Sequence, residues 1–175
     1  RVIGFGGRVI DDSQPKYLNS PETPLFNKSY HLYNLHRARK AIRQKQQAVL
    51  FEGYVDVITA WHAGVTNGVA SLGTSLTEDQ ARLLRRNAES VVICYDADSA
   101  GEEATLRGLD ILKSQGCSVK VAQLPDGTDP DEYIKTYGGE AFRQNILAAA
   151  VPLTAFKLQA LQKGVDVNDE DQRNQ

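Results

Sequence analysis

The sequence predicts an α/β fold in which helices cover an open parallel sheet, and three observations support this class. From residue 48 onward, short apolar runs rich in β-branched residues alternate with stretches of helical character. Two of those stretches open with the Ser/Thr-x-x-Glu/Gln pattern of a capping box. Acidic residues directly follow three of the apolar runs. Such alternation is typical of a parallel sheet buried on both faces.

The N-terminal part of the chain is expected to be less regular. Residues 1–10 are expected to form a strand whose glycines mark a bend, and residues 11–29 a proline-containing loop. Residues 30–45 are expected to form a helix, because apolar side chains recur there every three to four positions. Residues 1–48 carry nine Lys/Arg and three Asp/Glu, whereas the remainder has a net charge of −8. A basic arm beside an acidic region favours a polyanionic ligand, although a plain solvated surface has the same composition.

The second part is expected to alternate strand and helix. The expected strands are 48–51, 66–72, 90–95 and 118–124. The expected helices are 54–63, 77–87, 100–115, one beginning at Asp129-Pro130, and residues 139–163. Thr77 with Gln80 and Ser99 with Glu102 are the predicted capping boxes.

Composition limits the class of protein. No apolar run is long enough to cross a bilayer and no signal peptide opens the chain, so no membrane partner is expected. Cys94 and Cys117 are the only cysteines and lack zinc-ligand spacing, which favours a reducing, cytoplasmic location. The chain contains no methionine and opens in a strand-like run, so it is expected to be an internal piece of a longer protein.

Acidic residues gather at the predicted strand ends. They are Glu52 with Asp56, Asp96 with Asp98, and Asp126 with Asp129 and Asp131. Because ligands of an open parallel sheet bind beyond the carboxyl ends of its strands, we expect these carboxylates to share one rim. Like charges so close together need a cation, and oxygen ligands without Cys or His suit Mg²⁺ or Mn²⁺. The pattern therefore favours metal-assisted phosphoryl transfer.

Each acidic group also has an ordinary structural interpretation. Asp96 and Asp98 are two residues apart and, in an extended segment, point to the same side, but acids also complement a helix dipole. Asp129 before Pro130 is typical of an N-cap, a role compatible with metal binding. Outside these groups, Lys16-Tyr17-Leu-Asn19 combines a cation, a ring and an amide that can hold a phosphate and a base, or is simply a surface loop.

Taken together, the motifs resemble the Toprim fold of primases, topoisomerases and some nucleases, and more narrowly the RNA polymerase domain of bacterial DnaG-type primases. The segments that carry the resemblance are Gly7-Arg8, Pro15–Thr23, Glu52-Gly-Tyr-Val-Asp56, Val69–Thr74, Tyr95-Asp-Ala-Asp98 and Asp126-Gly-Thr-Asp-Pro-Asp131. The resemblance implies three parts: residues 1–47 within a basic N-terminal subdomain, 48–138 as a Toprim-type parallel sheet flanked by helices, and 139–175 as the start of a C-terminal helical subdomain.

The resemblance also implies an activity and a set of site residues. The activity is synthesis of short RNA primers on single-stranded DNA from ribonucleoside triphosphates, with Mg²⁺ or Mn²⁺. The implied catalytic residues are Glu52, Asp96 and Asp98. The implied metal ligands are Glu52, Asp56, Asp96, Asp98, Asp129 and Asp131. The implied nucleotide and nucleic-acid contacts are Arg8, Lys16, Tyr17, Asn19 and Lys28. Zinc and the replicative helicase are implied only for domains outside these residues, and the protein is expected to be a monomer.

Three other functions remain open at the level of sequence. A Toprim nuclease or topoisomerase shares the acids, but a topoisomerase needs a nucleophilic tyrosine in a separate domain. A haloacid-dehalogenase-type phosphatase also carries Asp-x-Asp after a strand, but it has Thr or Val where Ala100 stands here. A nucleic-acid-binding module without activity would not need the full set of acids.

Overall fold

A five-stranded sheet forms the centre of the molecule in the computed structural model, which describes residues 1–10, 17–73 and 75–164. The strands in spatial order are β4 (Gly68–Ala70), β3 (Gln47–Phe51), β5 (Ser90–Ile93), β6 (Ser118–Val121) and β7 (Val151–Pro152). The first four are parallel. These four strands form the predicted parallel sheet, and β7, which was not predicted, adds an antiparallel strand beside β6.

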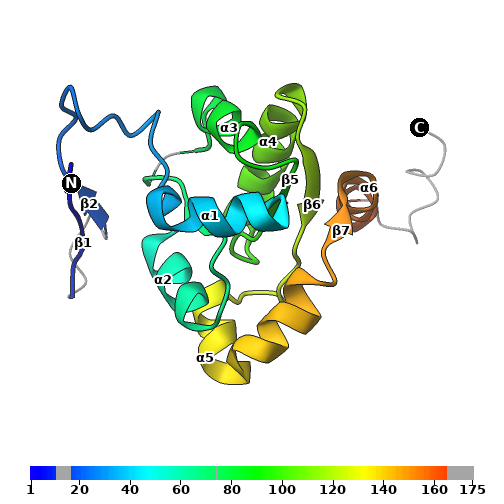
Figure 1. Cartoon of the computed structure of the whole chain (residues 1–175). Coiled ribbons are helices and arrows are strands. Elements are labelled where there is room, and N and C mark those ends of the chain that lie inside the picture. Colours follow the sequence, from blue (N-terminus) through cyan, green and yellow to red (C-terminus); the bar gives the residue numbers. More distant parts are fainter. Residues whose placement is uncertain (11–16, 74, 165–175) are drawn as a thin grey trace.

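Helices cover both faces of this sheet (Figure 1). They are α1 (Leu35–Lys45), α2 (Tyr54–His62), α3 (Glu78–Arg85), α4 (Ser99–Ser114), α5 (Pro130–Ala141), the π-helix η1 (Phe142–Leu147) and α6 (Leu153–Gly164). Side chains alternate along each strand, so Leu50 and Ile93 point into the cluster with α1, α3, α4 and α6. Val49 and Val92 point into the opposite cluster with α2, α5 and η1. Burial on both faces explains why these strands consist of unbroken apolar runs.

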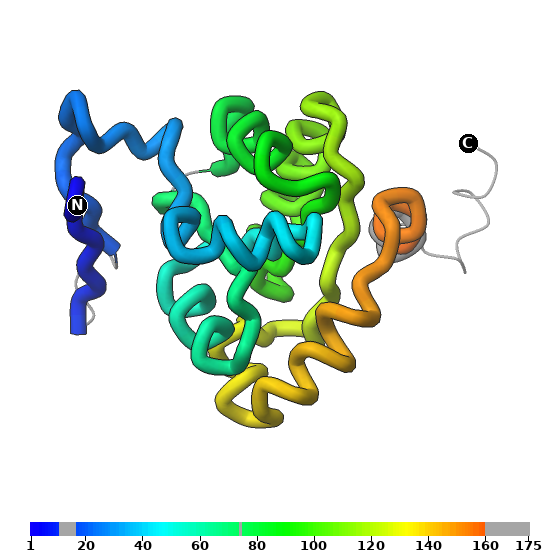
Figure 2. The backbone as a smooth tube through the Cα atoms, in the orientation of Figure 1, coloured from blue at the N-terminus to red at the C-terminus, as the bar shows by residue number. Residues whose placement is uncertain are grey.

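A two-stranded antiparallel sheet stands beside the main body. It pairs β1 (Gly6–Arg8) with β2 (Tyr17–Asn19), and its register places Arg8 opposite Tyr17. In Figure 2 this sheet and α6 lie at opposite sides of the molecule. The expected strand over residues 1–10 is therefore limited to three residues, and part of the expected loop 11–29 is a strand.

The helix expected over residues 30–45 begins only at Leu35. The preceding segment finds other partners for its backbone: Tyr33 exchanges two hydrogen bonds with Ala70 at the edge of β4. The buried Gln80 side chain donates to the carbonyls of Lys28 and His31. A helix through these residues would lose those partners, so the apolar spacing alone was a wrong guide to the helix start.

Two further expectations need correction. The N-cap of α4 is Asp98 rather than Ser99, because the Asp98 carboxylate accepts from Gly101 N–H at 2.7 Å. Residues 139–163 are not continuously helical, since β7 separates η1 from α6. The capping box of Thr77 with Gln80 and the N-cap at Asp129 are confirmed. Within the described ranges, none of the helices is both long and apolar enough to span a membrane.

Candidate active-site cleft

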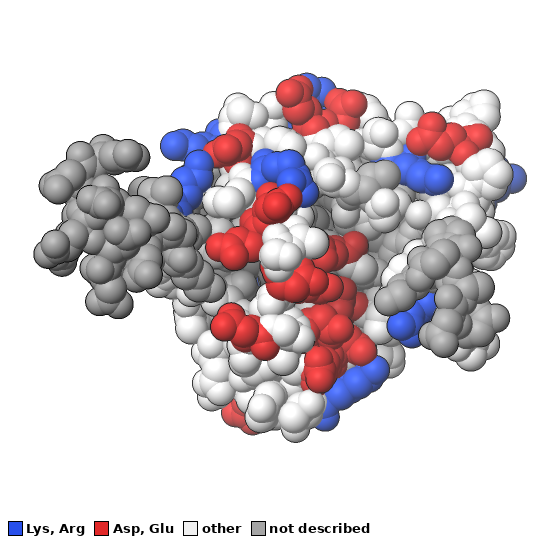
Figure 3. All heavy atoms as spheres, turned by 180° about the vertical axis from the view of Figure 1, so that it is seen from behind, with Lys and Arg blue, Asp and Glu red and all other residues white. Residues whose placement is uncertain are grey.

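Acids from three loops meet in one cleft at the carboxyl ends of β3, β5 and β6. The cleft has a volume of about 390 Å³. Its lining includes five of the six predicted metal ligands together with two residues of the small sheet: Glu52, Asp56, Asp96, Asp129, Asp131, Arg8 and Tyr17. The loops after β5 and β6 are held together by hydrogen bonds between Ala97 and both Gly127 and Thr128. Figure 3 shows a band of Asp and Glu side chains down the face turned away from the viewer in Figure 1.

Glu52 and Asp96 form the centre of the acidic group. Burial, followed by the charges of Asp96 and Asp98, raises the pKa of Glu52 to about 7. Burial, followed by the charges of Asp129 and Asp98, raises the pKa of Asp96 to about 6. The buried Oδ1 of Asp96 has no fixed donor among the described residues, although the Glu52 carboxyl can donate to Asp96 when it holds a proton. The two carboxyls therefore share a site in which full ionisation is unfavourable.

Asp56 lies deepest of the cleft acids. It is only 8% exposed, and its Oδ2 accepts from Gly53 N–H at 3.1 Å across the first turn of α2. Burial, followed by the charges of Asp96 and Asp129, raises its pKa to about 7. None of the causes that shift the pKa of Glu52, Asp56 or Asp96 is a cationic side chain.

Asp98 differs from the other predicted ligands because it does not line the cleft. One of its oxygens caps α4, yet its charge contributes to the raised pKa of both Glu52 and Asp96. Gly101 makes this turn possible, since a Cβ at that position would overlap the Asp96 carbonyl oxygen. The expectation that Asp96 and Asp98 face the same cation stays a prediction.

Asp129 and Asp131 lie at the start of α5. Asp129 caps the helix by accepting from Glu132 N–H at 2.7 Å. Asp131 accepts a hydrogen bond from the Thr59 hydroxyl at 2.6 Å. It also forms an ion pair with Lys135 Nζ at 2.6 Å. Thr59 and Lys135 were missed from the sequence. The pairing of Asp131 with Lys135 has the i, i+4 spacing of a helical ion pair, which was a readable signal.

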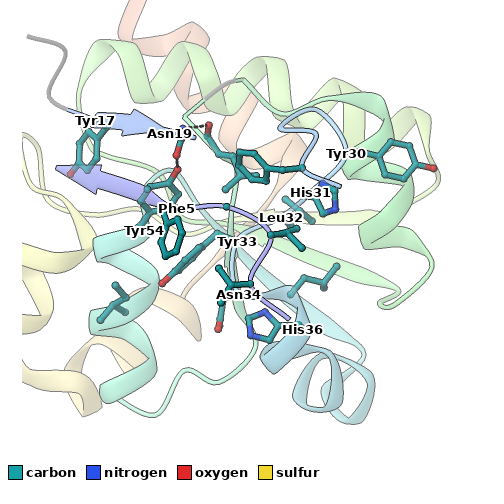
Figure 4. A pocket seen from close by; sticks show the side chains of 18 of the residues that line it. Phe5, Tyr17, Asn19, Tyr30, His31, Leu32, Tyr33, Asn34, His36 and Tyr54 are labelled. Atoms are coloured by element: carbon teal, nitrogen blue, oxygen red, sulfur yellow. Dashed lines mark hydrogen bonds between the residues drawn. The ribbon is translucent and has the colours of Figure 1, made fainter. Parts of the chain in front are cut away.

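The small sheet brings a cation and a ring to the same cleft. Arg8 lies over the Tyr17 ring, 5.8 Å from its centroid. Tyr17 packs edge to face on Tyr54, the residue after Glu52-Gly53. The Tyr54 hydroxyl donates to Asn19, whose amide donates to the Leu72 carbonyl (Figure 4). Tyr54 thus fastens β2 to the edge of the acidic cleft, a connection that sequence spacing could not reveal.

The remaining predicted nucleic-acid contacts lie elsewhere. Asn19 lines a neighbouring groove of about 1060 Å³ with aromatic walls that include Phe5, Tyr33 and Tyr54 (Figure 4). Lys28 lines neither cavity, and its backbone N–H donates to Glu22. Lys16 lies outside the described residues.

The donor atoms of the cleft acids are of the type that a hard divalent cation prefers. All donors are carboxylate oxygens, and the unpartnered Oδ1 of Asp96 is the kind of buried atom that a cation satisfies. No three Asp, Glu, His or Cys side chains within the described ranges converge enough to hold an ion by themselves. Mg²⁺ is commonly held by one or two carboxylates, with waters and substrate phosphates completing its shell, so this arrangement suits it.

Comparison with known proteins shows which family the chain resembles in sequence. The profile of a Toprim-like family matches residues 49–134, and that of the N-terminal domain of the DNA primase catalytic core matches residues 1–39. A DNA primase of Halalkalibacterium halodurans is 56% identical over 173 residues, which are 99% of this chain and 29% of that protein. The chain belongs to the bacterial DnaG-type primase family.

Solved structures of primases agree in fold. A DNA primase domain from Pseudomonas aeruginosa superposes with a TM-score of 0.86 at 41% identity, covering 95% of this chain and 53% of that one. A DnaG primase catalytic domain bound to single-stranded DNA gives a TM-score of 0.83 at 41% identity, covering 99% and 55%. The Toprim fold and the DnaG-type resemblance predicted from the sequence are thereby confirmed. The comparisons do not favour the nuclease, topoisomerase, phosphatase or inactive-module alternatives.

Proposed function

We propose that this chain is the metal-binding and nucleotide-binding part of a DNA-dependent RNA polymerase that makes short RNA primers on single-stranded DNA. The observation that carries the proposal is the single cleft in which acids from three strand ends face Arg8 and Tyr17 of the small sheet. The bound single-stranded DNA of the primase at 41% identity supports the choice of template. A Toprim nuclease would share the acids, but the primase relatives match nearly the whole chain.

In this proposal the acids hold one or more Mg²⁺ or Mn²⁺ ions. The proposed ligands are Glu52, Asp56, Asp96, Asp98, Asp129 and Asp131, with Glu52, Asp96 and Asp98 nearest to the chemistry. A bound divalent cation would make the primer 3′-hydroxyl more acidic and neutralise charge on the triphosphate. Arg8 offers a phosphate contact, and the half-exposed Tyr17 ring offers a surface on which a base can stack. Lys16, Asn19 and Lys28 remain proposed contacts to the template or nucleotide.

The activity of the longer protein, the activity of this chain alone, its domain division and its partners are also proposals. The chain spans 29% of the length of its Halalkalibacterium relative, so the activity of a whole primase is proposed for the longer protein. By itself the 175-residue chain is expected to bind metal and nucleotide but to synthesise little primer, because initiation must order two nucleotides and a template. The division at residues 47 and 138, a cytoplasmic monomer, and contact with the replicative helicase through another domain complete the proposal.

The test is incorporation of labelled ribonucleotides on an unprimed single-stranded template by a full-length primase carrying this sequence. We expect short RNA products that depend on Mg²⁺ or Mn²⁺. Asp98→Asn should lower synthesis on the order of a hundredfold or more, since it removes a charge at the reacting centre. Asparagine caps a helix about as well as aspartate, so the fold should persist. Near-normal synthesis by this variant would remove Asp98 from the site, and absence of any ribonucleotide incorporation by the wild type would refute the function.

A further inference from the structure

Asp131 is the one cleft acid in the described residues whose two oxygens both have side-chain partners. Oδ1 accepts from the hydroxyl of Thr59 on α2, and Oδ2 accepts from the ammonium group of Lys135, one turn further along α5. Both distances are 2.6 Å. The carboxylate therefore bridges α2 and α5, two of the helices that pack on this face of the sheet.

The two partners differ in how easily they can leave. The Lys135 side chain is 65% exposed, whereas that of Asp131 is 18% exposed. Lysine carries its charge on a flexible stem, and an exposed ion pair of this kind adds little stability, so the ammonium group can return to water at small cost. Thr59 is partly buried between α2 and α5, and its β-branched side chain has few alternative rotamers. Oδ1 is thus fixed, whereas Oδ2 is exchangeable.

We propose that Lys135 is a built-in counter-charge that occupies Oδ2 of Asp131 and yields it when a divalent cation is bound, while Thr59 keeps the carboxylate in place. The inference rests on the proposed function, because it requires a cation in the cleft. Both residues act through Asp131 and are positioning residues. Their opposite effects on cation affinity distinguish them: Lys135 competes with the cation, and Thr59 pre-organises a ligand for it.

The electrostatic surroundings of Lys135 include groups of both signs. The hydrogen bond and charge of Asp131 raise the pKa of Lys135, and Asp129 adds to that effect while Arg8 opposes it. The ammonium group therefore lies within the electrostatic field of Asp129, of Asp131 and of Arg8 on the cleft wall.

The test is a Mn²⁺ titration of the 175-residue chain followed by the electron paramagnetic resonance of free Mn²⁺. Lys135→Met should lower the Kd about two- to fivefold, the scale of one partly exposed ion pair. Lys157→Met is the matched control, because Lys157 also forms an ion pair at 2.7 Å, but its partner Asp110 does not line the cleft as Asp131 does. Equal affinities of the two methionine variants would overturn the competitive role of Lys135.

A second variant tests the fixed side of the carboxylate. Thr59→Val keeps the shape but removes the hydroxyl, and it should raise the Kd about tenfold, as loss of a residue that orients a ligand does. An unchanged Kd with an unchanged circular dichroism spectrum would overturn the role of Thr59. If Mn²⁺ broadens no amide signal near Glu52 and Asp96 in the wild type, the proposed cation site fails and this inference with it. If broadening occurs there but Lys135→Met binds no tighter than Lys157→Met, the exchange alone is wrong.

Discussion

Two sets of acids line the same cleft and are compensated in opposite ways. The acids after β3 and β5 (Glu52, Asp56 and Asp96, here the β3–β5 acids) have raised pKa values that no cationic side chain opposes. The acids at the start of α5 (Asp129 and Asp131, here the α5 acids) accept hydrogen bonds from a helix N-terminus, a hydroxyl and a lysine. The α5 acids thus include a carboxylate, Asp131, that is paired with a cation, whereas none of the causes that shift the pKa values of the β3–β5 acids is a cation.

This difference indicates where a cation gains most. A divalent ion placed beside the β3–β5 acids relieves repulsion and desolvation together, whereas at the α5 acids it must replace contacts already present. Raised pKa values from burial and like charges, located in a cleft, are typical of functional sites. We therefore expect the β3–β5 acids to contribute most of the cation affinity and the α5 acids to add further ligands.

The largest expected effect is on catalysis. In a full-length primase carrying this sequence, Asp96→Asn should lower primer synthesis about a hundredfold or more, because it removes an uncompensated charge from the reacting centre. Asp131→Asn should lower it by clearly less, since Lys135 already neutralises that carboxylate. Labelled ribonucleotide incorporation measures both, with the remote Asp110→Asn as control. Equal losses of primer synthesis in Asp96→Asn and Asp131→Asn would show that the β3–β5 acids and the α5 acids do not differ in this way.

Next in size is the pH dependence of stability without metal. The pKa values of Glu52, Asp56 and Asp96 are raised to about 7, 7 and 6 in the folded chain, against about 4 in the unfolded chain. Their contribution to stability is therefore complete below about pH 4 and is lost as pH rises towards 7, because the unfolded chain releases these protons first.

We expect this contribution to fall by about 1–3 kcal/mol between those limits, a figure discounted for the partial exposure of Glu52 and Asp96. Urea unfolding in EDTA at pH 4, 5.5, 7 and 8 measures the fall. Other carboxylates titrate in the same range, so the informative quantity is the difference between the wild type and a variant lacking Glu52, Asp56 and Asp96 charges. If the difference in the free energy of unfolding did not change with pH, the pKa values of these acids would not be raised in the folded chain.

Asp56→Asn isolates the most buried member of the β3–β5 set. The variant should be more stable than the wild type by about 1–2 kcal/mol in EDTA at pH 8, because it removes a buried charge but keeps an oxygen for Gly53 N–H. The gain should disappear below pH 4 and shrink when Mn²⁺ is added to the wild type. Destabilisation at pH 8 would mean that the charge of Asp56 is compensated by a contact not recognised in the fold.

The smallest effect is expected from the α5 acids and has the opposite sign. Asp131→Asn should destabilise the chain by about 0.5–1 kcal/mol in EDTA, since it weakens the hydrogen bond from Thr59 and the ion pair with Lys135. The loss should diminish at 1 M salt, where ion pairs are screened. A gain in stability, as expected for Asp56→Asn, would place Asp131 among the uncompensated acids after all.

Much of the framework could be predicted because its signals are local. The four parallel strands are apolar runs, and acids follow three of them. Thr77 and Asp129 cap helices by binding amides three residues further along the chain. A strand needs its own apolar residues and a cap its own side chain, so sequence spacing is sufficient for both. The rule that ligands meet at the carboxyl ends of parallel strands then gathers the acids.

Tertiary structure alone decided the details that depend on distant partners. Gln80 and β4 hold residues 30–34 out of the helix that their spacing predicts, and Gly101 beside the Asp96 carbonyl makes Asp98 the cap of α4. Contacts across α2 and α5 divide the acids into compensated and uncompensated sets. Local sequence places acids after the strands, but burial and partners are properties of packing between segments far apart in the chain. The raised pKa values of Glu52, Asp56 and Asp96 therefore became visible only in the folded molecule.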